Sequence, residues 1–254
     1  MRSAAGAPIV LLLAAGQGTR LKSRTIKLLH PVAGQPMVTW VARAARAIAP
    51  SRVVAVVGYQ ADRVKDALAE LCDAFVLQAE QRGTGHAVLT AEREAAKGAG
   101  TIVILNGDLP NLDAATLRAL LALHRRAKAA LSLVTTEVPD STGYGRILRD
   151  GKGRVLRIVE HKDASAAERS VREINCGIYC ADAAKIFRAL KRLRPDNAQG
   201  EYYLTDTVRL LLESGRRASV RCAPDYRMLL GINTPEQLAE AEAAWLAMRR
   251  GSPR

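Results

Sequence analysis

Short apolar runs alternate along the chain with longer segments in which apolar residues recur at helical spacing. The apolar runs cover residues 8–14, 53–58, 74–78, 101–108 and 129–137. The segments between them cover residues 37–49, 61–72, 84–97 and 113–127. Alternation of strands and helices is typical of a doubly wound sheet. The pattern therefore predicts a Rossmann-like α/β fold, with a mostly parallel sheet flanked by helices.

The pattern changes after residue 137, where short strands surround a glycine turn. Residues 145–161 and 175–181 are strand-like, and helical spacing returns over residues 201–215 and 234–250. We expect a β-rich lobe beside the main sheet. Because no repeat or linker interrupts the sequence, we predict a single domain over residues 1–254. Its first part would cover about 8–136, and the lobe and last helices about 137–250.

Composition supports a large core and an anionic ligand. The chain has 254 residues, 48% of them apolar, with a formal net charge of +13 and a pI of about 10.1. Such a charge suits nucleic acid, a membrane surface or a phosphorylated substrate. Aromatic residues make up only 4% of the chain, which is few for a base-stacking surface, and the arginines are scattered through helical segments. We therefore expect no nucleic-acid partner.

The first residues imitate a secretion signal, with Arg2 followed by an apolar run. That run continues without a break into the glycine turn, so its removal would destroy the first strand. No apolar run approaches the roughly 18 residues that a membrane span needs. We expect no membrane partner and a cytoplasmic location.

The four cysteines, at positions 72, 176, 180 and 222, are widely spaced apart from one C-x3-C pair in a strand-like stretch. This spacing favours reduced thiols in the core over a metal site or disulfides.

Gly16 and Gly18 follow the first strand, where the backbone of an α/β sheet commonly approaches phosphate groups. The turn lacks the spacing of a Walker loop, and Leu21 stands where a dinucleotide fingerprint has its third glycine. Residues 1–61 contain no Asp or Glu but eight basic residues. This cationic edge suits a triphosphate better than the ribose of a nicotinamide cofactor.

Two basic residues of this edge are the candidates to contact phosphate oxygens. Arg20 can bond a phosphate bidentately and Lys27 supplies a mobile point charge. Lys22 and Arg24 are expected to be solvated surface charges.

Further polar residues follow later strands of the predicted sheet. Asp108 comes directly after an apolar strand and is a candidate Mg²⁺ ligand, since Mg²⁺ combines one or two carboxylates with phosphates and water. The Gln78 amide could bind the edge of a base, and Gly83 would let the backbone come close. We expect His86, in the first turn of the predicted helix, to have a structural role.

The segments "LAAGQGTRLKS" (13–23) and "IKLLHPVAGQPM" (26–37) resemble the N-terminal signature of sugar-1-phosphate nucleotidyltransferases. Seven later segments resemble the uridylyltransferase domain of the bacterial N-acetylglucosamine-1-phosphate uridylyltransferases. They are "VLQAEQRGTGHAV", "NGDLP", "GYGRI", "IVEHKDAS", "EINCGIY", "NAQGEYYLTD" and "GINTPEQL". Together these motifs extend in order over about residues 9 to 245.

This resemblance implies a nucleotide-diphospho-sugar transferase fold and a UDP-N-acetylglucosamine pyrophosphorylase activity that serves cell wall biosynthesis. UTP and N-acetylglucosamine 1-phosphate would be the substrates and Mg²⁺ the cofactor. Arg20 and Lys27 would be catalytic. The nucleotide would contact Leu13, Ala14, Gly16, Gly18, Gln78, Gly83 and Thr84. The sugar phosphate would contact Gly145, Glu160, Asn175 and Asn233, and the metal would be held by Asp108 and Asn233.

The sequence departs from this family in three respects. Ile26 replaces the usual proline before the catalytic lysine, and Asn106 stands where some members have tyrosine. The sequence has no hexapeptide repeats, so we expect no acetyltransferase β-helix domain and no trimer contact through such a domain. The oligomeric state stays open. Two alternatives also stay open: a transferase for another sugar phosphate or nucleoside triphosphate, and a non-catalytic nucleotide- or nucleic-acid-binding protein.

Overall fold

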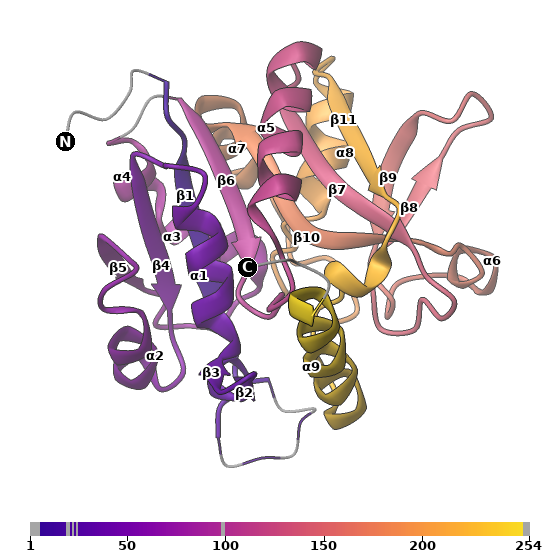
Figure 1. Cartoon of the computed structure of the whole chain (residues 1–254). Coiled ribbons are helices and arrows are strands. Elements are labelled where there is room, and N and C mark those ends of the chain that lie inside the picture. The colour runs from indigo at the N-terminus through magenta and orange to yellow at the C-terminus, as the bar shows by residue number, and fades with distance from the viewer. Residues whose placement is uncertain (1–5, 19–20, 22, 24, 98–99, 251–254) are drawn as a thin grey trace.

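The computed structural model describes residues 6–18, 21, 23, 25–97 and 100–250, without the side chains of residues 249 and 250. Within these residues, one large sheet has the strand order β11-β7-β10-β6-β1-β4-β5 (Figure 1). These strands are β1 (Ile9–Ala14), β4 (Arg52–Val57), β5 (Ala74–Leu77), β6 (Thr101–Asn106), β7 (Leu131–Glu137), β10 (Glu173–Asp182) and β11 (Ala218–Ala223).

Most strand pairs in this sheet are parallel. Strand β1 pairs in parallel with β4 and β6, β5 with β4, and β11 with β7, whereas β10 is antiparallel to both β6 and β7. All six residues of β1 are buried, as expected for a strand covered on both faces. The predicted fold class is therefore confirmed.

Helices cover both faces of the sheet. One face packs against α1 (Met37–Arg46), α2 (Ala61–Leu68), α5 (Ala114–Ala127) and α9 (Pro235–Arg250). The other face packs against α3 (Thr84–Thr90), α4 (Glu92–Ala95), α7 (Ala183–Leu190) and α8 (Asp206–Glu213). Val10 and Leu12 of β1 belong to the first core and Ile9 and Leu11 to the second, because successive side chains of a strand point to opposite faces.

The β-rich lobe is a hairpin attached to the long strand β10. Strands β8 (Arg146–Arg149) and β9 (Val155–Val159) pair antiparallel, and β8 also pairs with β10 (Figure 1). This agrees with the predicted lobe. The division of the chain near residue 136 stays a prediction.

Several short elements were not predicted, and one predicted helix is divided. The segment expected as a helix over 84–97 consists of α3 and α4, separated at Ala91. Among the unpredicted elements are α6 (Ala166–Arg169), α7 and β11. Each is short, and β11 is an edge strand with only partial burial, so its apolar alternation is weak.

The cysteine expectation is correct for three residues and wrong for one. All four thiols are free; Cys72, Cys176 and Cys180 are buried, but Cys222 is exposed. Cys222 lies on β11, an edge strand of the sheet, where one side of the strand is uncovered. Burial raises the pKa of the Cys180 thiol to about 12, so this thiol stays protonated and unreactive.

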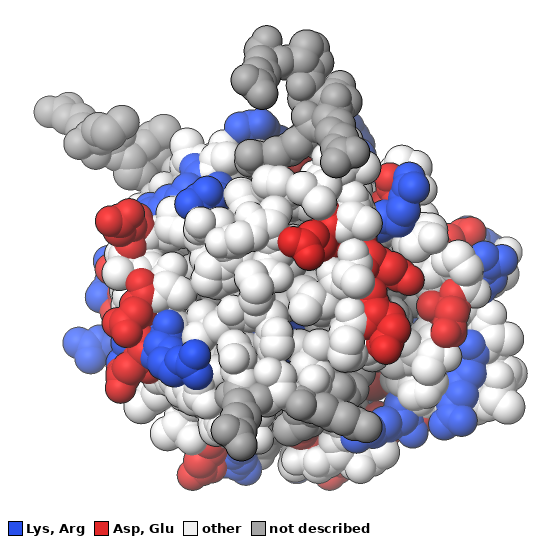
Figure 2. All heavy atoms as spheres, turned by 60° about the horizontal axis from the view of Figure 1, so that its bottom comes forward, with Lys and Arg blue, Asp and Glu red and all other residues white. Residues whose placement is uncertain are grey.

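Among the residues that the structure describes, none of the helices combines the length and the apolar composition needed to cross a bilayer. On the face that Figure 2 shows, basic and acidic side chains are interspersed around a largely uncharged middle. That face offers no continuous basic field to a polyanion.

Candidate active site

Two adjoining cavities lie at the carboxyl ends of the parallel strands. The first, of about 640 Å³, is lined by residues that follow β1, β5 and β6. The second, of about 540 Å³, is lined by the β-rich lobe and by the segment before α9. Both cavities include Lys27, Thr84, Asn106, Asp108 and Glu201, so these residues mark where the two meet.

The predicted nucleotide-binding residues gather around the first cavity, with one exception. Its lining includes Leu13, Gly16, Gly18, Gln78, Gly83 and Thr84. Ala14 instead is 1% exposed and packs into the core. Gly18 has a φ of 67°, and a Cβ at this position would overlap the side chain of Lys27. Glycine here lets the turn pass close to the lysine.

Lys27 lies at the junction of the two cavities and contacts two other predicted site residues. It begins the short 3-10 helix η2 (Lys27–Leu29). Its Nζ forms an ion pair with Asp108 Oδ2 at 2.5 Å and donates a hydrogen bond to Asn233 Oδ1 at 2.9 Å. The side chains of Lys27 and Asp108 are only 13% and 16% exposed, so this pairing is largely shielded from solvent.

The donors around Asp108 fit a divalent cation. Asp108 Oδ1 is buried and has no hydrogen-bond partner, which leaves a carboxylate oxygen available to a ligand. A Cβ on Gly231 would lie 3.2 Å from both Asp108 carboxylate oxygens, so glycine keeps the space beside them open. Among the described residues no group of three or more His, Cys, Asp or Glu could hold a metal. A carboxylate and an amide oxygen, completed by phosphates and water, is an arrangement that suits Mg²⁺.

Asn233 is free to serve this site because another residue caps the helix that follows it. Thr234 Oγ1 accepts the backbone N–H of Gln237 in the first turn of α9, at 3.3 Å. Asparagine is among the residues preferred at an N-cap, but Asn233 does not have that role here. In the structure its Oδ1 accepts from Lys27.

Gln237 connects Asn233 to the β-rich lobe. Its Oε1 accepts the backbone N–H of Asn233 at 2.7 Å, and its Nε2 donates to the Tyr144 hydroxyl at 3.2 Å. Tyr144 donates in turn to the carbonyl of Gly231 at 3.2 Å. The segment that carries Asn233 is thereby fixed against the loop that carries Gly145.

The remaining predicted sugar residues lie together in the second cavity. Asn175 donates its backbone N–H to Gly145 O at 2.8 Å, and Glu160 Oε1 accepts from the Thr205 hydroxyl at 3.0 Å. A Cβ on Gly145 would lie 3.3 Å from both Glu160 carboxylate oxygens. A small residue, an amide and a carboxylate therefore face one space, which suits the hydroxyl and amide groups of a sugar.

Replacing Glu160 by glutamine is expected to stabilise the fold in a pH-dependent way. Burial raises the pKa of the Glu160 carboxyl, and the Asp163 and Asp206 carboxylates raise it further, although the Thr205 hydrogen bond lowers it. A carboxyl whose pKa is higher in the folded chain destabilises that chain once the pH exceeds the pKa of the unfolded state. The penalty is absent in acid and grows as the pH rises. Thermal unfolding should show Glu160→Gln gaining more over the wild type at about pH 8 than at about pH 5.

An equal gain at both pH values would contradict this prediction. The same variant should bind the sugar phosphate more weakly, because an amide cannot accept hydrogen bonds at both of its polar atoms.

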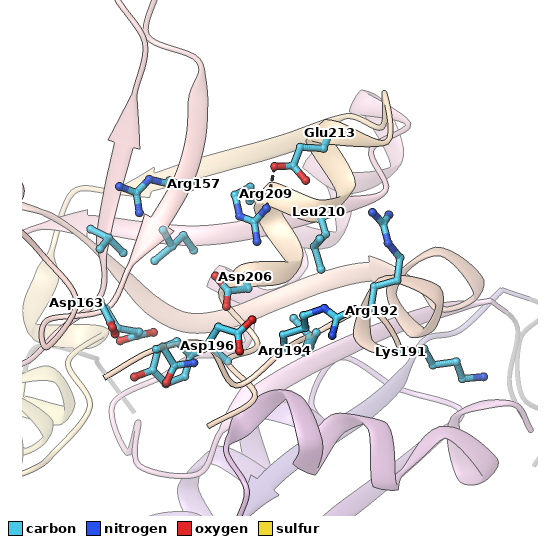
Figure 3. Close-up of a pocket in the computed structure, with 16 residues that line it drawn as sticks. Arg157, Asp163, Lys191, Arg192, Arg194, Asp196, Asp206, Arg209, Leu210 and Glu213 are labelled. Atoms are coloured by element: carbon cyan, nitrogen blue, oxygen red, sulfur yellow. Dashed lines mark hydrogen bonds and ion pairs between the residues drawn. The ribbon is translucent and has the colours of Figure 1, made fainter. Parts of the chain in front are cut away.

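A third cavity, of about 810 Å³, shares Glu160 and Tyr203 with the lining of the second cavity. Figure 3 shows charged side chains around it, among them Asp163, Asp206 and Arg209. Several of its charged side chains already have ion-pair partners. Arg209 pairs with Glu213 at 2.8 Å, and Arg157 pairs with Glu168. Glu160 is the only predicted site residue in its described lining, so this larger space is not the candidate active site.

Arg20 lies outside the described residues, as do Lys22 and Arg24, so its catalytic role stays a prediction. The neighbouring departure at Ile26 can be explained. Ile26 is 2% exposed, with φ −60° and ψ 144°, a conformation that proline also adopts. The loop therefore keeps a proline-like backbone while the isoleucine side chain adds to the core.

Sequence reasoning missed several residues that line the two cavities. They include Gln17, Gln81, Gly107 and Glu201 around the first cavity, and His161 and Lys162 in the second. Asn106, which the sequence analysis named only as a departure from the family, lines both cavities. Most of them lie within the quoted motifs, so proximity to a predicted residue was the available signal. The contact of His86 with Gln78 was also missed, because residues eight positions apart give no local pattern.

A model of the MobA-like NTP transferase domain family matches residues 10–210, and the chain belongs to this family. Among curated proteins it is 50% identical over 233 residues to the bifunctional protein GlmU of Brevibacillus brevis, covering 92% of this chain and 50% of that protein. It is 49% identical over 232 residues to the bifunctional protein GlmU of Geobacter metallireducens, covering 91% and 49%. The chain thus spans about half the length of the curated relatives it matches.

Solved structures confirm the fold. A UDP-glucose pyrophosphorylase complexed with UDP-glucose superposes with a TM-score of 0.74 at 21% identity, over 96% of this chain and 100% of that chain. A putative glucose-1-phosphate thymidylyltransferase from Bacillus anthracis gives a TM-score of 0.77 at 21% identity, over 98% and 97%. The nucleotidyltransferase family expected from the motifs is confirmed, and members of this family typically use a divalent metal.

Proposed function

We propose that the chain transfers UMP from UTP to N-acetylglucosamine 1-phosphate, giving UDP-N-acetylglucosamine and pyrophosphate with Mg²⁺ as cofactor. The observation that carries this proposal is the position of Lys27 and Asp108 where the two cavities meet. A nucleotide in the first cavity and a sugar phosphate in the second would bring their phosphates together at these two residues. The motif resemblance and the 50% identity to a GlmU protein support the choice of substrates.

The reaction needs no general base from the protein. A phosphate oxygen of the sugar phosphate is already anionic and attacks the α-phosphorus of UTP in line. One P–O bond forms at the α-phosphorus as the bond to the bridging oxygen of the β-phosphate breaks, and pyrophosphate leaves with that electron pair. Catalysis then depends on positioning and charge neutralisation.

Lys27 is the described cation best placed for this task. In the structure its ammonium bridges Asp108 and Asn233, and a triphosphate in the first cavity offers it competing anionic partners. Arg20, outside the described residues, is proposed to contact the same phosphates. Bound Mg²⁺ would neutralise phosphate charge, and Asp108 with Asn233 would hold it.

The β-rich lobe is proposed to hold the sugar. Glu160 would accept hydrogen bonds from sugar hydroxyls, and Asn175 would bond a hydroxyl or phosphate oxygen. Gly145 would let the ring approach the Glu160 carboxylate. We also propose a cytoplasmic location, where UTP is available; neither a membrane nor a nucleic acid is part of the proposal.

A substrate panel tests this function. Pyrophosphate release is measured with UTP, CTP, ATP, GTP and dTTP, each against N-acetylglucosamine, glucosamine and glucose 1-phosphates, with Mg²⁺ or EDTA. We expect the highest kcat/KM for UTP with N-acetylglucosamine 1-phosphate and no release with EDTA. A higher value for another pair would favour a related transferase, and salt-sensitive binding of nucleic acid without any release would favour a binding protein.

A further inference from the structure

Gln78 is held by two neighbours that use both of its amide hydrogens. It follows β5, is 3% exposed and lines the first cavity. Its Nε2 donates to the carbonyl oxygen of Gly83 at 3.2 Å and to His86 Nδ1 at 3.0 Å. The Gly83 carbonyl belongs to the turn before α3, and His86 lies within that helix.

These contacts allow only one orientation of the amide. Turning it over would place Oε1 against the Gly83 carbonyl oxygen, and two acceptors at that distance repel each other. The same arrangement fixes the His86 tautomer, because Nδ1 must accept and the ring proton therefore lies on Nε2.

The oxygen of the amide is the atom left for a ligand. Gln78 Oε1 has no hydrogen-bond partner among the described residues, and it is not one of the fully buried atoms that lack a partner. Because Gln78 lines the first cavity, a base there meets an acceptor at this point and no donor from the same side chain.

We infer that His86 and the Gly83 carbonyl lock Gln78 as an acceptor, and that this lock makes the first cavity select a pyrimidine that carries a hydrogen on N3. Uracil and thymine present N3–H, whereas cytosine presents a lone pair at N3. In a cytosine nucleotide the lone pair of N3 would face Gln78 Oε1, and both acceptors would lack a hydrogen-bond donor. An unmade buried hydrogen bond of this kind lowers affinity by roughly tenfold to a hundredfold.

In this inference His86 is a positioning residue, acting through Gln78 without touching the nucleotide. The inference rests on the proposed function, since it concerns the base of the same nucleotide. It adds a physical reason for choosing uridine over cytidine, and it assigns that choice to a residue outside the predicted site.

Two substitutions of His86 distinguish its effect on the orientation of the Gln78 amide from its effect on side-chain packing. His86→Leu fills similar space but offers no acceptor, so one Gln78 N–H loses its partner and one of the two restraints is removed. His86→Asn can place an amide oxygen where Nδ1 stands and should keep the restraint. Binding of UDP and CDP is measured by titration calorimetry on the whole chain with Mg²⁺, and circular dichroism checks the fold of each variant.

We expect the wild type to prefer UDP over CDP by at least about tenfold. His86→Leu should lose part of that preference, through gained CDP affinity and weakened UDP affinity, because only the Gly83 carbonyl still restrains the amide. His86→Asn should largely restore the preference. An unchanged preference in a His86→Leu chain that still binds UDP would overturn the inference alone. A wild type that binds no uridine nucleotide would overturn the proposed function instead.

Discussion

Asp108→Asn is expected to lower Mg²⁺-dependent turnover by at least about a hundredfold while the chain still folds. The substitution keeps the size of the side chain and leaves an amide oxygen able to accept from Lys27 Nζ. It removes the negative charge that the site offers to a cation. It also removes one of two carboxylate oxygens, of which Oδ1 is buried with no partner in the described structure. That buried oxygen is best explained as a ligand for a group the fold itself does not supply.

The measurement is pyrophosphate release from UTP and N-acetylglucosamine 1-phosphate across a Mg²⁺ titration. The variant should need more Mg²⁺ and stay slow at saturation, since its amide oxygen neutralises no charge. Near-normal turnover in Asp108→Asn at ordinary Mg²⁺ would contradict both the metal assignment and the mechanism.

Asp113 supplies a matched control five positions along the chain. Its Oδ1 accepts the backbone N–H of Thr116 at 2.8 Å and so caps α5. Asp113→Ala should reduce the free energy of unfolding by about 1 kcal/mol and leave turnover unchanged. If Asp108→Asn lowers turnover and Asp113→Ala does not, the effect depends on the position of the Asp108 carboxylate and not on a general loss of stability.

The sequence predicted the central sheet because its strands are strongly apolar and its helices are regularly spaced. β1 and β6 are buried almost throughout, so their apolar runs were unambiguous. β11 could not be found in the same way, since its residues are at most partly buried and an edge strand need not alternate. The exposure of Cys222 was misjudged for the same reason.

For the site, the motifs identified candidate residues but not the contacts between them. The sequence indicated Lys27, Asp108 and Asn233 as separate candidates, more than two hundred positions apart at the extremes. Only the fold shows that the lysine bridges the other two. The orienting contacts of Gln237 and His86 depend on the path of the backbone between distant segments, and residue type alone does not encode that path.

Lys27→Met is expected to change two properties in opposite directions. Turnover should fall by about a hundredfold, because the ammonium no longer neutralises phosphate charge in the transition state. Metal affinity in the absence of nucleotide should rise by about tenfold. The reason is geometric: Lys27 Nζ now lies 2.5 Å from Asp108 Oδ2 and 2.9 Å from Asn233 Oδ1, so a cation must displace it from both proposed ligands.

Electron paramagnetic resonance of Mn²⁺ measures the metal affinity, and pyrophosphate release measures the turnover. Lys27→Arg is the matched control, since it keeps a cation beside Asp108 and should not raise metal affinity. If Lys27→Met lost turnover without binding Mn²⁺ more tightly, Lys27 would act on the substrate alone and not compete with the metal. If turnover falls and Mn²⁺ affinity rises together, Lys27 competes with the metal for Asp108 and Asn233 in the unliganded chain. A bound triphosphate would then release these two ligands by pairing with the lysine. Metal binding would thereby be coupled to nucleotide binding.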